Sequence, residues 1–259
     1  MAGTFYPADA DVLRATVDDL IASATRPGMD RRPRALVVPH AGYLYSGPVA
    51  ATAYAALVPW RNEISRVVLL GPAHRVALRG LALPSVEAFR TPLGDVAIDA
   101  ETRASLADTM DVVVDDLPHA LEHSIEVQLP FLQRVLDEFT IVPFVVGRAD
   151  TSSVANLLDV FWDANATLVV VSTDLSHYEE YESAAAHDRR TVAAISTNDV
   201  DAIRPQDACG ASPLRGLLAL ARRRGVDPQL LDLRSSGDTA GSRDRVVGYS
   251  AFAVRSISA

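Results

Sequence analysis

The sequence predicts a single α/β domain with a mixed or mostly parallel central sheet and helices on both faces of that sheet. Short runs of β-branched and other apolar residues alternate along the chain with segments of helical periodicity. The apolar runs are continuous rather than alternating, which indicates strands buried on both faces. A chain of 259 residues with 49% hydrophobic content can bury one substantial core, so we expect one domain over residues 1–259.

The predicted elements follow one another in an order typical of this class. A strand over 34–40, an Ala-rich helix over 47–58 and a strand over 65–74 form the first β-α-β unit. Residues 80–99 carry Pro and Gly between short runs and predict a hairpin-like excursion. Further strands are expected at 139–147, 167–174, 229–234 and 246–254, and further helices at 100–109, 122–136, 151–162, 180–196 and 212–224.

Two of these segments carry more specific expectations. An apolar stripe runs along the predicted helix 122–136 through Ile125, Leu129, Leu132 and Leu136. Pro130 lies within this helix and is expected to kink it. The stretch 235–245, rich in Gly, Ser and Asp, is typical of a mobile surface loop or an active-site flap.

Charge and composition argue against several classes of function. The net charge is −9 with a pI near 5.1, and no segment interleaves clustered basic residues with aromatic ones, so nucleic acid is not an expected partner. All 24 basic side chains are Arg, which excludes a Schiff-base or Walker lysine. No apolar run approaches the roughly 20 residues that span a bilayer. The start "MAGTFYPADA" does not resemble a signal peptide and the one cysteine has no internal partner, so we expect a cytoplasmic protein.

Polar side chains stand where three of the predicted strands end. The first strand ends at His40, the second runs into His74, and the strand near 167–174 runs into Asp174 and His177. Ligands of open α/β sheets collect at the carboxyl ends of strands. We therefore expect these four side chains to share one edge of the sheet.

The other histidines have simpler interpretations. A lone histidine in a loop is more often half-buried with a satisfied hydrogen bond than a ligand. We therefore interpret His119 and His187 as structural. His123 is intermediate, because it stands at the start of a predicted helix beside Glu122 and Glu126.

Cys209 is open to two interpretations. A single cysteine is most often a small buried hydrophobe, but Cys209 precedes Gly210 and the predicted start of a helix. A helix N-terminus lowers the pKa of a thiol and favours the thiolate, which binds metals or attacks electrophiles. Imidazoles with a thiolate or a carboxylate make a three-ligand set for Fe(II), Zn(II) or copper and leave a histidine as acid or base. The chain has no tightly spaced ligand pair such as C-x-x-C, so the spacing of these residues alone does not decide whether they bind a metal.

Six short motifs occur in an order that identifies a family. They are "AGTFYP" (2–7), "PHAGYLYSG" (39–47), "GPAH" (71–74), "EHSIEVQLPF" (122–131), "STDLSHY" (172–178) and "CGASP" (209–213). Together they resemble the Memo family, in particular the bacterial and archaeal branch labelled AmmeMemoRadiSam system protein B, over nearly the whole chain. The resemblance implies a fold similar to the class III extradiol dioxygenases, with a metal cleft at the strand ends.

The resemblance also implies roles for particular residues. Carried over position by position, His40, His74 and Cys209 are the expected metal ligands. Asp174 and His177 would line the same cleft, and His177 matches the position of an acid/base histidine in the related dioxygenases. The thiol departs from the carboxylate of those dioxygenases, so ring cleavage itself is not implied.

Three further residues are candidates for the same cleft: Tyr43, Glu122 and His123. The first hypothesis is a metal-dependent enzyme that performs redox chemistry on a small organic substrate, with iron as the expected metal, copper or zinc as alternatives, and hydrolysis as the alternative reaction. The second hypothesis is a non-catalytic metal- or peptide-binding partner of the AMMECR1-like and radical SAM proteins that accompany this family. The sequence therefore leaves open whether the chain is an enzyme.

Overall fold

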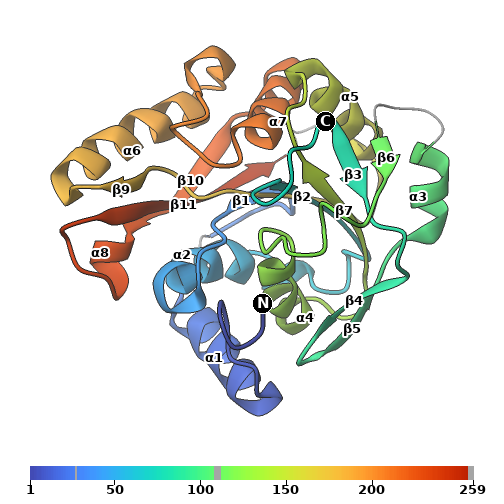
Figure 1. Cartoon of the computed structure of the whole chain (residues 1–259), viewed down its shortest axis with the longest axis horizontal. Coiled ribbons are helices and arrows are strands. Elements are labelled where there is room, and N and C mark those ends of the chain that lie inside the picture. The colour runs from blue at the N-terminus through green and yellow to red at the C-terminus, as the bar shows by residue number, and fades with distance from the viewer. Residues whose placement is uncertain (27, 108–111, 256–259) are drawn as a thin grey trace.

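A nine-stranded mixed sheet forms the centre of the molecule (Figure 1). The structure, a computed structural model, describes all residues except 27, 108–111 and 256–259. The order of strands is β10-β11-β1-β8-β2-β7-β3-β6, with β9 paired to β11. Their bounds are β1 Pro33–Val38, β2 Arg66–Pro72, β3 Leu81–Leu83, β6 Val112–Val114, β7 Thr140–Val146, β8 Thr167–Ser172, β9 His177–Glu179, β10 Pro228–Ser235 and β11 Val246–Arg255. A separate hairpin joins β4 (Ala88–Thr91) to β5 (Gly94–Ala97).

The four central strands are parallel. Strands β1, β8, β2 and β7 are neighbours in that order, and each pairs in parallel with the next. The first two predicted strands therefore belong to one sheet but do not touch, because β8 lies between them. The antiparallel pairs of β11 with β1 and of β3 with β7 make the sheet mixed, as predicted.

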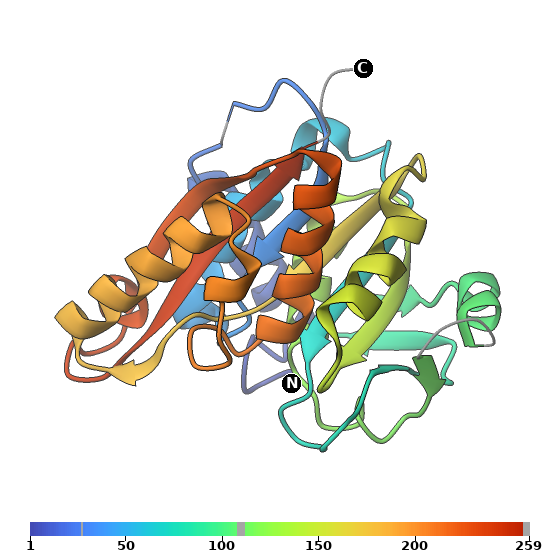
Figure 2. The ribbon, with the colours of Figure 1, turned by 90° about the horizontal axis from the view of Figure 1, so that it is seen from above.

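Helices cover both faces of the sheet (Figures 1 and 2). Helices α5, α6 and α7 lie on one side, and α1, α2 and α4 lie on the other. The helix bounds are α1 Ala10–Ser23, α2 Tyr43–Ala55, α3 Ala100–Ala107, α4 Leu129–Val135, α5 Thr151–Trp162, α6 Tyr181–Ser196, α7 Ala211–Arg224 and α8 Ser236–Thr239, with short 3-10 turns η1 Val58–Trp60, η2 Glu126–Gln128 and η3 Val200–Ala202.

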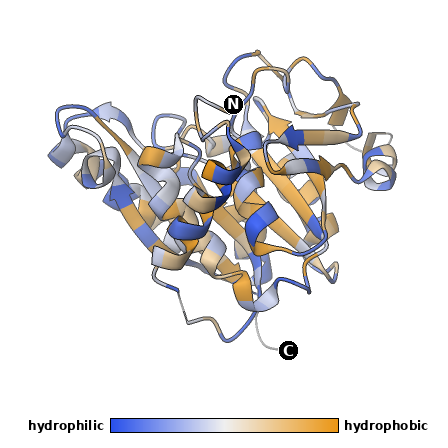
Figure 3. Cartoon of the chain, turned by 90° about the horizontal axis from the view of Figure 1, so that it is seen from below, coloured by the Kyte–Doolittle hydropathy of each residue, from blue (hydrophilic) through white to orange (hydrophobic). Residues whose placement is uncertain are grey.

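The apolar strands are explained by this double cover. Along β1, the side chain of Val37 joins the core beneath α5 and α7, while Leu36 and Val38 join the core beneath α1, α2 and α4. Alternate residues of a strand point to opposite faces, so both sets must be apolar when both faces are buried. Figure 3 shows the same result as a band of hydrophobic strands through the centre of the molecule.

The structure corrects several expected elements. Helix α1 is absent from the predicted elements, although Asp9 caps its N-terminus and an apolar stripe runs along it. Helix α2 begins at Tyr43, four residues before the expected start at 47. The excursion 80–99 contains β3 as well as the hairpin, and β6 was not predicted. The end of the helix expected at 100–109 lies outside the described residues.

Two further corrections concern Pro130 and the stretch 235–245. Residues 126–128 form the turn η2, and α4 begins only at Leu129, so Pro130 lies in the first turn of a helix. It produces no kink there, because the first-turn N–H groups have no partner within the helix. The stretch 235–245 is not wholly a loop, since Ser235 and Asp238 form a capping box that starts α8.

Candidate metal centre

The parallel strands bring three of the predicted residues to one edge of the sheet. Strand β1 ends two residues before His40, β2 two residues before His74, and β8 two residues before Asp174. These strands are parallel neighbours, so their carboxyl ends meet at the same edge. The structure therefore brings His40, His74 and Asp174 to the same edge of the sheet.

Cys209 reaches the same edge from the loop that precedes α7. Its backbone N–H donates to the carbonyl of Asp174 over 3.2 Å. The neighbouring N–H of Gly210 donates to Thr173 Oγ1 over 2.8 Å. A Cβ atom at Gly210 would lie 2.7 Å from the Cβ of Thr173, so only glycine allows this close approach of the two loops.

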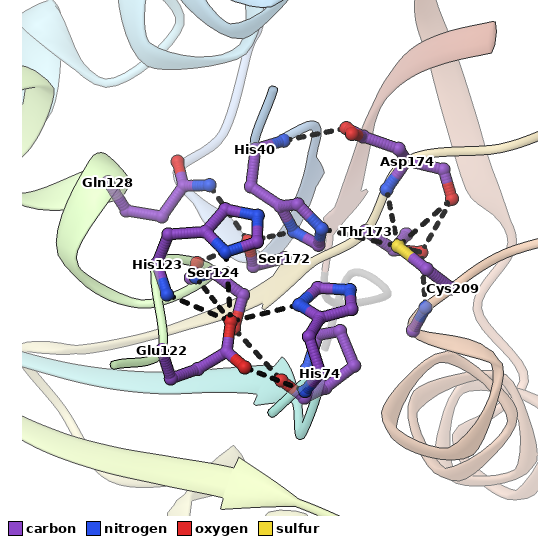
Figure 4. Close-up of polar contacts among 12 residues, drawn as sticks. His40, His74, Glu122, His123, Ser124, Gln128, Ser172, Thr173, Asp174 and Cys209 are labelled. Atoms are coloured by element: carbon purple, nitrogen blue, oxygen red, sulfur yellow. Dashed lines mark hydrogen bonds and ion pairs between the residues drawn. The ribbon is translucent and has the colours of Figure 1, made fainter. Parts of the chain in front are cut away.

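Three histidine rings face one another in this region (Figure 4). The ring centroid of His40 lies 5.1 Å from that of His74 and 5.3 Å from that of His123. One ring nitrogen from each histidine lies within 4.8 Å of the others, and the group can hold a metal ion. Phe5 stacks on His123 with a centroid distance of 4.3 Å and encloses the cluster from the N-terminal segment.

Glu122 organises the segment around His74 and His123. Its Oε2 accepts the backbone N–H of His74 over 2.7 Å, and its Oε1 faces the Nδ1 of the same residue at 2.9 Å. Oε1 also accepts the backbone N–H groups of His123 and Ser124. Burial raises the pKa of Glu122, but the hydrogen bonds from His74 and Ser124 outweigh it and lower the pKa to about 2. Glu122 is therefore an anion, and His74 donates its Nδ1–H to it, which leaves His74 Nε2 available as a ligand.

His40 is the most deeply buried of the three histidines. Its Nδ1 lies 2.9 Å from Ser172 Oγ, and its Nε2 lies 3.2 Å from the sulfur of Cys209. Burial, followed by the charges of His74 and His123, holds its pKa well below the usual range. His40 is therefore a neutral imidazole, the form that binds metals.

Cys209 does not behave as its place before a helix predicts. Burial and then the negative charge of Asp174 raise the pKa of the thiol to about 12. In the protein without metal the sulfur is therefore a protonated thiol, and the expected lowering of its pKa by the helix N-terminus is wrong. A metal ion would have to displace the thiol proton to bind the sulfur.

Asp174 and His177 occupy different environments at the edge. Asp174 is buried, and its Oδ1 accepts the backbone N–H of His40 over 2.7 Å. Burial raises the pKa of this carboxyl to about 6. His177 is exposed at the start of β9 and donates its Nδ1–H to the carbonyl of Leu175 over 2.8 Å, so its Nε2 carries the lone pair. A protonated His177 would lower the pKa of both Asp174 and His40, so His177 lies close enough to interact electrostatically with the cluster.

The remaining candidates have structural partners. Tyr43 donates its hydroxyl hydrogen to the carbonyl of Val127 over 2.6 Å and so anchors the segment that carries Glu122. His119 donates from Nε2 to the carbonyl of Ala82, in agreement with its structural interpretation. His187 bonds to two carboxylates, those of Glu179 and Asp207, each over 2.7 Å.

Sequence reasoning missed the polar residues behind His40. The buried side chains of Gln128 and Ser172 form hydrogen bonds beneath the imidazole (Figure 4). One signal was present, because Gln128 is a polar residue in the apolar segment "IEVQLPF". A buried amide must find partners, so such a residue indicates a hydrogen-bond network.

The donor set fits a metal ion. Among the described residues the buried Nδ1 of His123 forms no hydrogen bond, although it lies 3.3 Å from Glu122 Oε1. Ligands at about 2.1 Å (nitrogen) and 2.3 Å (sulfur) from one ion stand about 3.1–3.6 Å apart for angles of roughly 90–109°. The 3.2 Å between His40 Nε2 and Cys209 Sγ falls within this range. Imidazole and thiol ligands suit iron, zinc or copper.

The fold and the site define an α/β protein with a candidate metal centre at the carboxyl edge of its parallel strands. The family model described as "Memo-like protein" matches residues 1–253, and the chain belongs to this family. The MEMO1 family protein MK0963 of Methanopyrus kandleri is 36% identical over 98% of this chain and 97% of its own length. MEMO1 family proteins of Aeropyrum pernix and Sulfolobus acidocaldarius are 36% and 33% identical, over 98% and 96% of this chain and 97% and 95% of their own.

A solved structure shares the fold. The crystal structure of uncharacterized protein JW3007 from Escherichia coli K12 superposes with a TM-score of 0.51 over 84% of this chain and 99% of that chain. The identity is 14%, so this similarity concerns the fold alone. Within the described residues, no helix has the length and apolar character required to cross a membrane.

Proposed function

We propose that this chain is a metal-dependent enzyme that performs redox chemistry on a small organic substrate, with iron bound by His40, His74 and Cys209. The observation that carries the proposal is the group of His40, His74 and His123, with the sulfur of Cys209 3.2 Å from the Nε2 of His40. Copper and zinc accept the same ligands. A single domain over residues 1–259 and a cytoplasmic location are parts of the proposal.

The third ligand distinguishes two forms of this site. His123 belongs to the three-histidine cluster, and its buried Nδ1 lies 3.3 Å from Glu122 Oε1 without forming a hydrogen bond. Cys209 contacts His40 directly and supplies a softer donor. We assign Cys209 as the third ligand on the contact to His40 and on the family resemblance, and we assign His123 to the wall of the cleft.

The chemistry proposed for the site divides between the ion and the protein. When bound, the ion would activate dioxygen or polarise a substrate oxygen. In a dioxygenase-type reaction both atoms of dioxygen enter the substrate, so no external reductant is required. His177 has a free lone pair on Nε2, which accepts the proton of a substrate hydroxyl and later returns it. Asp174 accepts the backbone N–H of His40 through its Oδ1. Its negative charge would orient His177 for proton transfer.

Metal analysis of purified variants tests the proposal. His40→Ala and His74→Ala should each lose iron stoichiometry, measured by mass spectrometry after anaerobic loading, because each removes one ligand. His119→Ala is the matched control, since His119 bonds to the carbonyl of Ala82 and should leave iron content unchanged. Unchanged stoichiometry in both cluster variants would contradict the shared site.

Two more variants separate the possible third ligands. Cys209→Ser replaces a soft donor by a hard, poorly ionised hydroxyl and should lose more iron affinity than His123→Gln. The reverse order would assign His123 as the ligand. Oxygen uptake in a substrate screen that depends on bound iron would support the enzyme. Metal-free protein that binds AMMECR1-like and radical SAM proteins normally, with no iron-dependent uptake, would favour a non-catalytic partner protein.

A further inference from the structure

The hydrogen bonds of Ser172 determine which nitrogen of His40 carries the proton. The Ser172 hydroxyl donates to the carbonyl of Ser124 over 2.6 Å and accepts from Gln128 Nε2 over 2.8 Å. A hydroxyl has one hydrogen to donate and two lone pairs. The remaining partner, His40 Nδ1 at 2.9 Å, must therefore donate its hydrogen to Ser172 Oγ.

We infer that Ser172 and Gln128 are positioning residues that hold His40 as the Nδ1–H tautomer. This inference rests on the proposed metal site, because the tautomer leaves the lone pair of His40 on Nε2, the nitrogen 3.2 Å from Cys209 Sγ. A proton on Nε2 would instead occupy the lone pair with which this nitrogen binds a metal ion. The two residues act on the metal only through His40.

The orientation of Gln128 is itself fixed by its other partners. Its Nε2 also donates to the carbonyl of Pro39 over 2.9 Å, and a carbonyl can only accept. Its Oε1 accepts the hydroxyl hydrogen of Tyr54 over 2.8 Å. The side chains of Gln128, Tyr54 and Ser172 are buried, so a rotated amide would leave buried groups unpaired. The donor to Ser172 is therefore the Gln128 amide in one orientation.

His40 and His74 reach the same tautomer by different means. His74 donates its Nδ1–H to the carboxylate of Glu122, whereas His40 donates to a neutral hydroxyl. Because these two hydrogen bonds are independent, a substitution that removes the hydrogen-bond acceptor of His40 should leave the tautomer of His74 unchanged. His74 therefore serves as an internal control within the same molecule.

Long-range ¹H–¹⁵N spectra of the metal-free protein, labelled with ¹⁵N-histidine, test the inference directly. In the unmodified protein the neutral rings of both His40 and His74 should carry their hydrogen on Nδ1. In Ser172→Ala the acceptor of His40 is lost, so its ring should shift toward the Nε2–H tautomer while His74 stays unchanged. Tyr54→Phe is the control for the loss of a buried hydrogen bond in the same network and should leave both tautomers in place.

Metal affinity supplies the second readout. Binding of Zn(II) alone, measured by competition with a chromophoric chelator, should weaken about 10- to 100-fold in Ser172→Ala and less in Tyr54→Phe. An Nε2–H tautomer of His40 in the unmodified protein would overturn the inference, whether or not any variant folds. Unchanged tautomer and affinity in Ser172→Ala would also overturn it. If the unmodified protein binds no metal, the proposed function fails, but the tautomer of the metal-free protein still tests the inference.

Discussion

Replacement of Glu122 by Gln should weaken both the fold and the metal centre. The carboxylate accepts four hydrogen bonds, two from His74, one from the backbone of His123 and one from the backbone of Ser124. Three of the four donors meet at Oε1, so the amide oxygen of the substituted side chain would take that position. Its NH₂ group would then face the backbone N–H of His74, and two donors would oppose each other.

The size of the effect follows from this count. A hydrogen bond to a charged group contributes about 1.5–3 kcal/mol, and a neutral acceptor supports roughly half as much. The variant loses one such bond and weakens three, while removal of the buried charge recovers part of its desolvation cost. We expect a net loss of about 2–4 kcal/mol in the free energy of unfolding. That loss is smaller than the roughly 5–15 kcal/mol of a typical domain, so the variant should still fold.

Urea denaturation of the metal-free protein measures the stability, and Zn(II) competition measures the affinity. Glu122→Gln should also reduce the affinity about 10- to 100-fold, because a neutral amide oxygen holds the Nδ1–H of His74 less strongly than a carboxylate and makes the ring a less basic ligand. Glu126→Gln is the matched control on the same segment, because it neutralises a carboxylate that bonds to Tyr6 and the N-terminal amino group instead of to His74. A loss below about 1 kcal/mol together with unchanged Zn(II) affinity would refute the role of Glu122 in positioning His74.

Three further predictions concern pH, packing and metal. Burial lowers the pKa of His187, but its hydrogen bonds to Asp207 and Glu179 outweigh this and raise the pKa above 6.5. The resulting stability is fully present below pH 6.5 and is lost as the pH rises through the raised value, so His187→Gln should flatten the dependence of urea midpoints on pH. Gly216→Ala would place a Cβ 2.5 Å from the Cβ of Val154 between α7 and α5. Its overpacking cost of about 1–3 kcal/mol should exceed the gain of about 1 kcal/mol in helix propensity, and a stabilised variant in urea would contradict this. Zn(II) at a hundredfold excess over its Kd should raise the free energy of unfolding by about 2.7 kcal/mol, and a chelator should reverse the change in thermal scans.

The meeting of site residues at one edge of the sheet was predictable, because it depends on local signals in the sequence. Continuous apolar runs mark strands buried on both faces, and the polar residues directly after them mark the strand ends. His40, His74 and Asp174 each stand two residues beyond a strand, so their meeting follows once the strands are parallel. Helix α1 carries equally local signals, a capping Asp9 and an apolar stripe, but it precedes the first strand and so lies outside the alternation of strands and helices.

The network behind His40 was not predictable from spacing. Gln128 and Ser172 are 44 residues apart in the sequence, and their contact depends on how the turn η2 approaches the end of β8. A polar residue within an apolar segment indicates that some partner exists, but it does not identify the partner. The direction of the hydrogen bonds, and so the tautomer of His40, is fixed only when all acceptors around Ser172 are known.

Cys209 shows where a local rule loses to its surroundings. A helix N-terminus stabilises a thiolate most when the sulfur lies within the first turn, whereas Cys209 precedes the N-cap Gly210 and lies outside the helix. Its sulfur accepts the backbone N–H of Asp174 over 3.3 Å, but burial and the carboxylate of Asp174 have the larger effect on its pKa. The same burial places the thiol beside the lone pair of His40 Nε2, to which it can donate its hydrogen. Sγ and Nε2 therefore lie 3.2 Å apart without a metal ion, a separation within the range for two ligands of one ion.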